Sequence, residues 1–170
     1  MRNPARAIAI VSLGLSPIVG LWALHRSLAA PLVVFNPSPS EPVGLYRLMR
    51  ASPAAGRLVA FKVPAPGRAY ATQHIGYVMR GGILKEIAAG PGSTICEHDG
   101  GIFIGGQRRG AVAVRDRMGT LLPHWSGCIR LAHGELFAFS DRIPNSFDSR
   151  YYGPVQASDV MGVYAPVWTK

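Results

Sequence analysis

Hydrophobic residues form one long run near the N-terminus and then many short runs separated by glycine, proline and polar residues. The long run covers residues 7–24, contains no charged side chain, and is interrupted only by Ser12, Ser16, Pro17 and glycines. As an α-helix it would be about 27 Å long at ~1.5 Å per residue, close to the ~30 Å apolar thickness of a bilayer. Pro17 is compatible with such a helix because side chains or water can satisfy the carbonyl groups that it leaves free. The pattern therefore predicts a single transmembrane helix.

Basic residues before this run favour one orientation in the membrane. Arg2 and Arg6 precede it, and loops that carry lysine and arginine tend to stay in the cytoplasm. We therefore expect a cytoplasmic N-terminus over residues 1–6, a membrane anchor over residues 7–24 and an exported domain over residues 31–170.

A cleavable signal peptide is the alternative interpretation of the same run. Small residues at 27–30 offer a cleavage site. However, the 18 apolar residues exceed the ~7–15 that are usual for the hydrophobic part of a signal peptide, so a retained anchor is the preferred interpretation. Both interpretations export the rest of the chain.

Short apolar runs bounded by turn residues follow, as is typical of β-strands. The Asp99-Gly100 pair between two of these runs predicts a hairpin. The segments 51–56 and 64–67 predict surface turns, and 7–24 is the one strong helix candidate. The pattern predicts a mainly β domain with an antiparallel sheet. The expected strands cover residues 58–63, 83–89, 94–96, 101–104, 135–140 and 160–167.

Composition and charge narrow the class of protein. The chain has 170 residues, of which 48% are hydrophobic, and this argues against a disordered or fibrous protein. The formal charge is +9, but the arginines are scattered, and Arg108-Arg109 is the only adjacent pair of them. We therefore expect no nucleic-acid partner, whereas a basic surface suits anionic lipid head groups.

Export changes the meaning of the two cysteines, because thiols in an oxidising compartment tend to pair. We expect a Cys96–Cys128 disulfide. The alternative is a metal site, which lacks the closely spaced ligand pairs that are typical of zinc proteins. Its candidate ligands would be the two cysteines with His98, Asp99, His124 and His133.

Ser40 and Lys85 are the candidate catalytic residues. Ser40 lies in a proline-rich turn and Lys85 in an apolar strand-like run. A strand would enclose Lys85 between apolar neighbours, and burial lowers the pKa of a lysine toward the range of a general base. The simpler alternatives are a turn-forming serine and a lysine that faces solvent or pairs with Glu86.

A polar cluster over residues 140–153 follows the expected strand that ends at Ser140. Taken alone, it is typical of a polar turn closed by an ion pair, either Asp148 with Arg150 or Asp141 with Arg142.

Taken together and in this order, these segments resemble the type I signal peptidase family, and within it the TraF-type conjugative transfer peptidases. The serine turn is Ser38-Pro39-Ser40, the lysine strand ends in Gly90-Pro91-Gly92, and the late box is Asn145-Ser146-Phe147-Asp148-Ser149-Arg150-Tyr151-Tyr152-Gly153. The segment 56–61 resembles the family strand between the serine and the lysine. The resemblance implies a barrel-like antiparallel catalytic domain behind a membrane helix.

Departures from the general signal peptidases favour the conjugative branch. Glu41 replaces the methionine that usually follows the serine, and Glu86 replaces the arginine that commonly follows the lysine. The late box opens with Ser140-Asp141-Arg142 instead of Gly-Asp-Asn-Arg. The segment Pro42-Val43-Gly44-Leu45-Tyr46 is similar to the conjugative form.

The resemblance also implies roles for individual residues. Neutral Lys85 would take the proton of Ser40, which would attack a peptide carbonyl and form an acyl-enzyme. The Ser40 amide and the Ser38 hydroxyl would stabilise the oxyanion, and Ser146 would orient the lysine amine. Asp148 would act at the site directly or as the partner of Arg150. This chemistry implies neither a metal nor another cofactor.

The implied partner is an exported precursor, a conjugative pilin in the first instance, processed at the periplasmic side of the inner membrane and in some members cyclised. Three alternatives remain. The first is a general signal peptidase that cleaves many exported proteins. The second is an inactive membrane-anchored scaffold of a secretion apparatus. The third is a Ser-His-Asp arrangement that uses His74, His124 or His133.

Overall fold

The computed structural model describes residues 30–76 and 82–170. The chain divides into two units, Met1–Leu32 and Val33–Lys170, and all the described helices and strands belong to the second. The expected cytoplasmic segment 1–6 and the expected anchor 7–24 lie outside the described residues. Within the two described ranges, no helix combines the length and the apolar character that crossing a bilayer requires.

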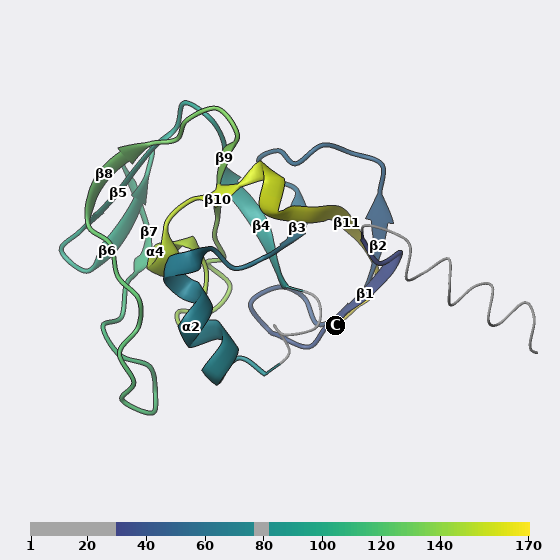
Figure 1. Cartoon of the computed structure of the whole chain (residues 1–170), viewed down its shortest axis with the longest axis horizontal. Coiled ribbons are helices and arrows are strands. Elements are labelled where there is room, and N and C mark those ends of the chain that lie inside the picture. The colour runs from purple at the N-terminus through teal and green to yellow at the C-terminus, as the bar shows by residue number, and fades with distance from the viewer. Residues whose placement is uncertain (1–29, 77–81) are drawn as a thin grey trace, which may run out of the picture. The chain divides into compact units, whose positions relative to one another are not determined.

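Seven antiparallel strands form the larger sheet, in the order β1-β2-β11-β3-β4-β9-β10 (Figure 1). β1 and β10 are the edge strands, so the sheet is open, and the prediction of a mainly β antiparallel fold is confirmed. The strands are β1 (Val33–Asn36), β2 (Gly44–Met49), β3 (Leu58–Phe61), β4 (Ile83–Ala89), β9 (Glu135–Ala138), β10 (Val155–Gln156) and β11 (Val160–Thr169).

A second, four-stranded antiparallel sheet has the order β7-β6-β5-β8. It contains β5 (Thr94–His98), β6 (Gly101–Ile104), β7 (Gln107–Ala111) and β8 (Gly127–Arg130). The expected hairpin is present, because His98 pairs with Gly101 and the two turn residues both have positive φ, 51° at Asp99 and 64° at Gly100. Such a turn matches the right-handed twist of the strands on either side.

The prediction of a surface turn at residues 64–67 is wrong. Pro64 is the N-cap of helix α2 (Ala65–His74), and Pro66 lies in its first turn. Proline is tolerated there because the first amide groups of a helix have no partner within the helix. A second helix, α4 (Ser149–Tyr152), follows the N-cap residue Asp148, and a 3-10 turn, η1 (Ala157–Asp159), leads into β11.

Strict alternation in β4 fixes the position of Lys85. Ile83, Lys85, Ile87 and Ala89 are buried, whereas Glu86 between them is exposed. The inward residues of β4 pack against side chains of β3, β9, β11 and the two helices, which together form the main core. The alternative in which Lys85 faces solvent is therefore wrong, and the lysine projects from a rigid strand into the interior.

Candidate active site

A single side-chain amide shapes the turn that carries Ser40. Asn36, at the end of β1, donates hydrogen bonds to the carbonyl oxygens of Ser38 at 2.8 Å, Glu41 at 3.1 Å and Pro42 at 3.1 Å. Its carbonyl oxygen accepts the Ser38 amide at 3.2 Å. Because Asn36 is itself buried, these bonds hold the proline-rich segment in one conformation. The local sequence thus forms a rigid platform for Ser40.

Ser40 and Lys85 meet at the bottom of this turn. The Lys85 amine donates a hydrogen bond to the Ser40 hydroxyl, and each residue is only 2% exposed. Burial lowers the pKa of Lys85 to about 8, while the nearby carboxylates of Asp148 and Glu41 oppose that change and Arg150 assists it. The structure therefore joins a hydroxyl to an amine that loses its proton close to neutral pH.

Ser38 lies on the other side of the Ser40 hydroxyl. The two hydroxyl oxygens are 2.9 Å apart, and the Ser40 amide donates a long hydrogen bond of 3.4 Å to the Ser38 oxygen. The two groups that the sequence suggests as oxyanion donors therefore adjoin the atom that would attack.

Asp148 is engaged by Arg150. Its carboxylate accepts the Arg150 Nε at 2.8 Å and the Nη2 at 3.0 Å, and it also accepts the Ser140 amide at 3.1 Å. Both members of the ion pair are almost completely buried. Of the two alternatives left open by the sequence, the structure favours Asp148 as the partner of Arg150, since its hydrogen bonds go to Arg150 and Ser140.

Arg150 ties the late box to several other segments. Its Nη1 donates to the carbonyl oxygens of Ala111 at 3.1 Å and Pro144 at 3.2 Å, and its Nη2 donates to that of Ser140 at 2.5 Å. The guanidinium carbon lies 4.4 Å from the centre of the Phe139 ring. The other suggested ion pair, Asp141 with Arg142, is wrong, because Asp141 pairs with Arg109 at 2.9 Å.

Ser146 is buried, and its hydroxyl has no hydrogen-bond partner among the described residues. It lines the same cavity as Ser40 and Lys85 but does not make the expected bond to the lysine amine.

A cavity of about 590 Å³ opens beside these groups. Ser38, Ser40, Lys85 and Ser146 line it together, which brings four of the expected site residues to one surface. The rest of the wall is mostly apolar, although Arg115, Asp116 and Arg117 also line it. Apolar contributors include Ile75, Ile83, Val112, Leu122, Phe147 and Tyr151.

Three residues at the site were missed by the sequence reasoning. Asn36 organises the serine turn, the Ser140 hydroxyl donates to the Ser40 carbonyl oxygen, and Glu41 is buried beside the pair. An asparagine directly before a proline-rich turn was an available signal, because its side chain commonly bonds to backbone groups nearby. Ser140 lies 100 positions from Ser40, and local sequence gave no signal for that contact.

The histidines of the alternative triad lie elsewhere. His74, His124 and His133 are exposed and do not line the cavity. His74 stacks on Tyr70 of α2, and His124 lies 3.6 Å from Glu97. The placement of the three imidazoles gives no support to a Ser-His-Asp arrangement at Ser40.

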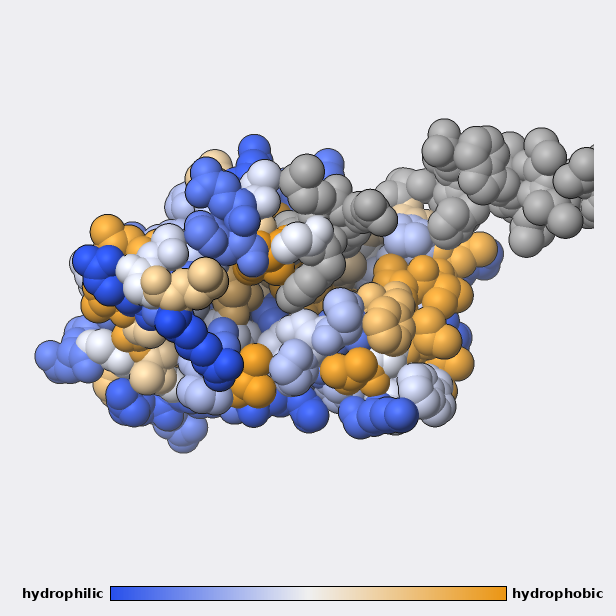
Figure 2. All heavy atoms as spheres, turned by 90° about the horizontal axis from the view of Figure 1, so that it is seen from below, coloured by the Kyte–Doolittle hydropathy of each residue, from blue (hydrophilic) through white to orange (hydrophobic). Residues whose placement is uncertain are grey.

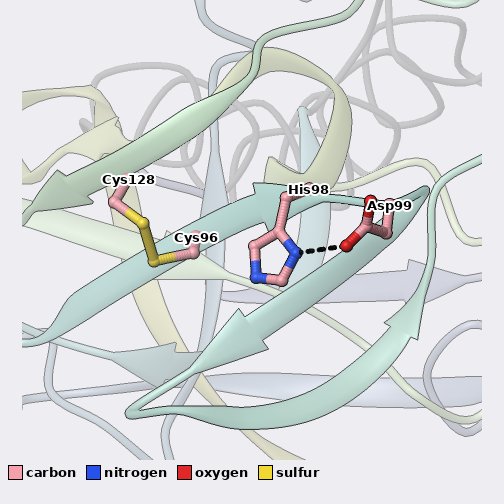
Figure 3. The surroundings of a disulfide bond; sticks show 4 residues. All are labelled: Cys96, His98, Asp99 and Cys128. Atoms are coloured by element: carbon pink, nitrogen blue, oxygen red, sulfur yellow. Dashed lines mark hydrogen bonds and ion pairs between the residues drawn. A yellow bond between two sulfur atoms is a disulfide. The ribbon is translucent and has the colours of Figure 1, made fainter.

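The expected disulfide is confirmed. Cys96 on β5 and Cys128 on β8 face each other in the register of the small sheet and are joined (Figure 3). This bond removes both thiolates from the alternative metal site. His98, on the same strand as Cys96, instead bonds to Asp99 at 3.0 Å (Figure 3).

Comparison with known proteins shows which proteins this chain resembles. The family model for "Signal peptidase, peptidase S26" matches residues 7–168. A plasmid transfer protein TraF from Escherichia coli is 31% identical over 144 residues, which cover 79% of this chain and 81% of that protein. A conjugal transfer protein TraF from Agrobacterium tumefaciens (strain 15955) is 34% identical over 147 residues, which cover 79% of this chain and 81% of that protein.

Among solved structures, a signal peptidase I from Enterococcus faecalis V583 aligns with a TM-score of 0.37 and 21% identity, over 66% of this chain and 97% of that one. The family match extends over nearly the whole sequence, and the TraF relatives cover most of it. The chain therefore belongs to the signal peptidase family, peptidase S26.

Proposed function

We propose that the chain is a membrane-bound serine endopeptidase with Ser40 as the nucleophile and Lys85 as its general base. The contact between the Ser40 hydroxyl and the buried Lys85 amine carries this proposal. A hydroxyl is a poor nucleophile until a neighbour accepts its proton. An amine whose pKa is about 8 is partly neutral near pH 7 and can accept it.

The reaction begins when the neutral Lys85 amine takes the Ser40 proton and the serine oxygen bonds to the carbonyl carbon of the precursor. The ammonium group then gives that proton to the departing nitrogen, so the peptide bond breaks and an ester on Ser40 remains. Attack by water on this ester, with Lys85 again as the base, releases a hydrolysed product. Attack by an amine of the substrate forms a new amide and a cyclic product.

The Ser40 amide and the Ser38 hydroxyl are the proposed donors to the developing oxyanion. Both adjoin the attacking oxygen, and the bond between them is long at 3.4 Å. A carbonyl oxygen placed between the two donors would receive both hydrogen bonds. Fixed donors of this kind stabilise the tetrahedral intermediate more than the substrate.

An exported precursor is the proposed substrate, and a pilin of a conjugative transfer apparatus is the first candidate. Membership in the signal peptidase family supports an exported precursor, and the relatives named for plasmid and conjugal transfer support the narrower class. The largely apolar cavity beside Ser40 is suited to an extended apolar segment of such a chain.

We place the enzyme at the inner membrane, with its catalytic domain on the periplasmic side. The uncharged run 7–24 supports an anchor. A row of exposed apolar side chains, Phe35, Leu45 and Trp168, crosses β1, β2 and β11. Figure 2 shows hydrophobic residues gathered toward the side on which β1 and β2 lie in Figure 1. Such a row suits a catalytic domain that acts close to a lipid surface.

Mass spectrometry of a co-expressed pilin-like precursor tests the proposal. The wild-type chain, Ser40→Ala and Lys85→Ala are compared, with the exposed Lys62→Ala as the matched control. We expect the wild type and Lys62→Ala to process the precursor, and Ser40→Ala and Lys85→Ala to leave it unprocessed. If the two ends are rejoined, the product is lighter by one water than the hydrolysed product.

Three other outcomes decide against parts of the proposal. Cleavage of many unrelated precursors would favour a general signal peptidase over a pilin-specific enzyme. Processing that survives in both Ser40→Ala and Lys85→Ala would overturn the pair. No processing of any precursor by the folded wild-type chain would favour the scaffold.

A further inference from the structure

We propose that Glu41 is a positioning residue for the Ser40–Lys85 pair: its carboxyl group fastens the serine turn to β4, and its negative charge acts on the lysine amine. The inference rests on the proposed function, because Glu41 can position the pair for catalysis only if Ser40 and Lys85 are catalytic. It assigns a role to a position at which the general signal peptidases carry a methionine, which has neither a carboxylate acceptor nor a charge.

Two consecutive residues of the serine turn bond to two consecutive residues of β4. Ser40 bonds to Lys85 through its side chain, and the Glu41 carboxylate accepts the backbone amide of Glu86 at 3.1 Å. Glu41 is only 4% exposed, and its own carbonyl oxygen accepts the Asn36 amide. The second bond therefore fixes the turn against the strand immediately beside the reacting atoms.

Charged and titratable side chains from three segments act on Glu41. Lys85 and Glu86 face it from β4, Tyr46 faces it from β2, and Arg142 faces it from the segment after β9. Glu41 also lines a small cavity of about 120 Å³ together with Arg109 and Asp141, which form an ion pair. Lys85 is the buried cation among these groups, so water screens its interaction with the charge of Glu41 only weakly.

The charge of Glu41 bears on catalysis because it affects the ionisation of Lys85. Burial raises the pKa of Glu41 to about 7, although the Glu86 amide and Lys85 oppose the change. The pKa of Lys85 is about 8, because burial lowers it, the carboxylates of Asp148 and Glu41 raise it and Arg150 lowers it. Where Glu41 is ionised, its negative charge stabilises the ammonium form of Lys85. Removal of the charge therefore lets the amine become neutral at lower pH.

Direct titration of Lys85 by NMR tests the inference without any substrate. The chain contains three lysines, Lys62, Lys85 and Lys170, so full-length protein labelled with ¹³Cε-lysine in detergent gives a simple spectrum. Loss of one signal in Lys85→Ala assigns the resonance of interest. The midpoint is then compared among the wild type, Glu41→Gln and a matched control.

Glu135→Gln is that control, because the Glu135 carboxylate also accepts a backbone amide, that of Ala132 at 2.8 Å, but lies away from the pair. Glutamine at position 41 keeps an acceptor for the Glu86 amide and removes the charge. We expect its Lys85 midpoint to fall by roughly one pH unit, at the lower end of the effect of a nearby opposite charge. A midpoint equal to that of the wild type and of Glu135→Gln would overturn the inference.

Activity measurements separate positioning from charge. We expect Glu41→Ala to lower kcat because the turn loses its bond to β4, and Glu41→Gln to restore most of kcat while its pH profile moves to lower pH. A merely structural glutamate would leave the pH profile in place. If the NMR midpoint moves but no variant, including the wild type, cleaves a precursor, the coupling stands and the proposed function fails.

Discussion

The Ser140 hydroxyl donates a hydrogen bond to the carbonyl oxygen of Ser40, although the two residues lie 100 positions apart. The Ser140 amide in turn donates to Asp148, which is held by Arg150. A continuous chain of hydrogen bonds therefore runs from the late polar box to the serine turn. The box acts on the site through this chain and holds Ser40 in position.

Removal of the Ser140 hydroxyl tests this link. We expect Ser140→Ala to lower kcat at least about tenfold, since small displacements of a reacting group are costly. The free energy of unfolding should fall by about 1–3 kcal/mol, because a buried acceptor loses its donor. Turnover and urea unfolding measure the two effects, with the exposed Ser126→Ala as the control. Unchanged turnover in Ser140→Ala would contradict a positioning role.

Asp148 should matter chiefly for stability. Asp148→Ala leaves a buried Arg150 without its counter-charge, and we expect the free energy of unfolding to fall by about 3–5 kcal/mol. Asp141→Ala breaks the exposed pair with Arg109, whose side chains are 58% and 39% accessible, and should cost about 0–1 kcal/mol. Loss of cleavage by an Asp148→Ala protein of wild-type stability would instead identify a direct catalytic participant.

Ser38 should act in the transition state. Loss of one oxyanion donor costs about 10²–10³ in kcat in comparable enzymes, so we expect Ser38→Ala to reduce kcat by that order with little change in KM. Ser38→Thr keeps the hydroxyl and should recover a large part of the rate. Equal rates for Ser38→Ala and the wild type would remove Ser38 from the oxyanion site.

Local sequence patterns predicted the strands that have a clear apolar character. β4 matches its expected range of 83–89, and the hairpin through Asp99-Gly100 is present. β1, β2, β7, β8 and β10 were missed. α2 was missed as well, because Pro64 and Pro66 are typical of turns and also of the first turn of a helix. Such segments depend on packing that a short stretch of sequence does not encode.

The site could likewise be predicted only as far as its residues lie in local motifs. Ser40, Lys85 and the Asp148–Arg150 pair lie in local motifs, and the structure brings them together. The Ser140 contact and the burial of Glu41 arise only when strands far apart in the sequence pair. The motifs mark Glu41 and Ser140 only as departures from the general signal peptidases, so three-dimensional pairing was needed to find their contacts.

The Cys96–Cys128 bond should stabilise the β domain. It links positions 32 residues apart, and closing a loop of that length stabilises a fold by roughly 3–4 kcal/mol in the chain-entropy model. We expect the wild type to lose about that amount of unfolding free energy in reducing agent, and Cys96→Ser/Cys128→Ser to be insensitive to reductant. Equal stability of the wild type with and without reductant would show that the bond contributes little.

The pH dependence of kcat/KM for precursor cleavage is the decisive test of Lys85 as the base for Ser40, because this ratio reports the ionisation of the free enzyme. Lys85 must be neutral to accept the Ser40 proton, so its active fraction increases as pH rises through its pKa of about 8. We expect kcat/KM to climb with a midpoint near pH 8 and to be lost in Lys85→Ala. A midpoint near ~6.5, the reference value of histidine, together with activity retained in Lys85→Ala, would contradict it.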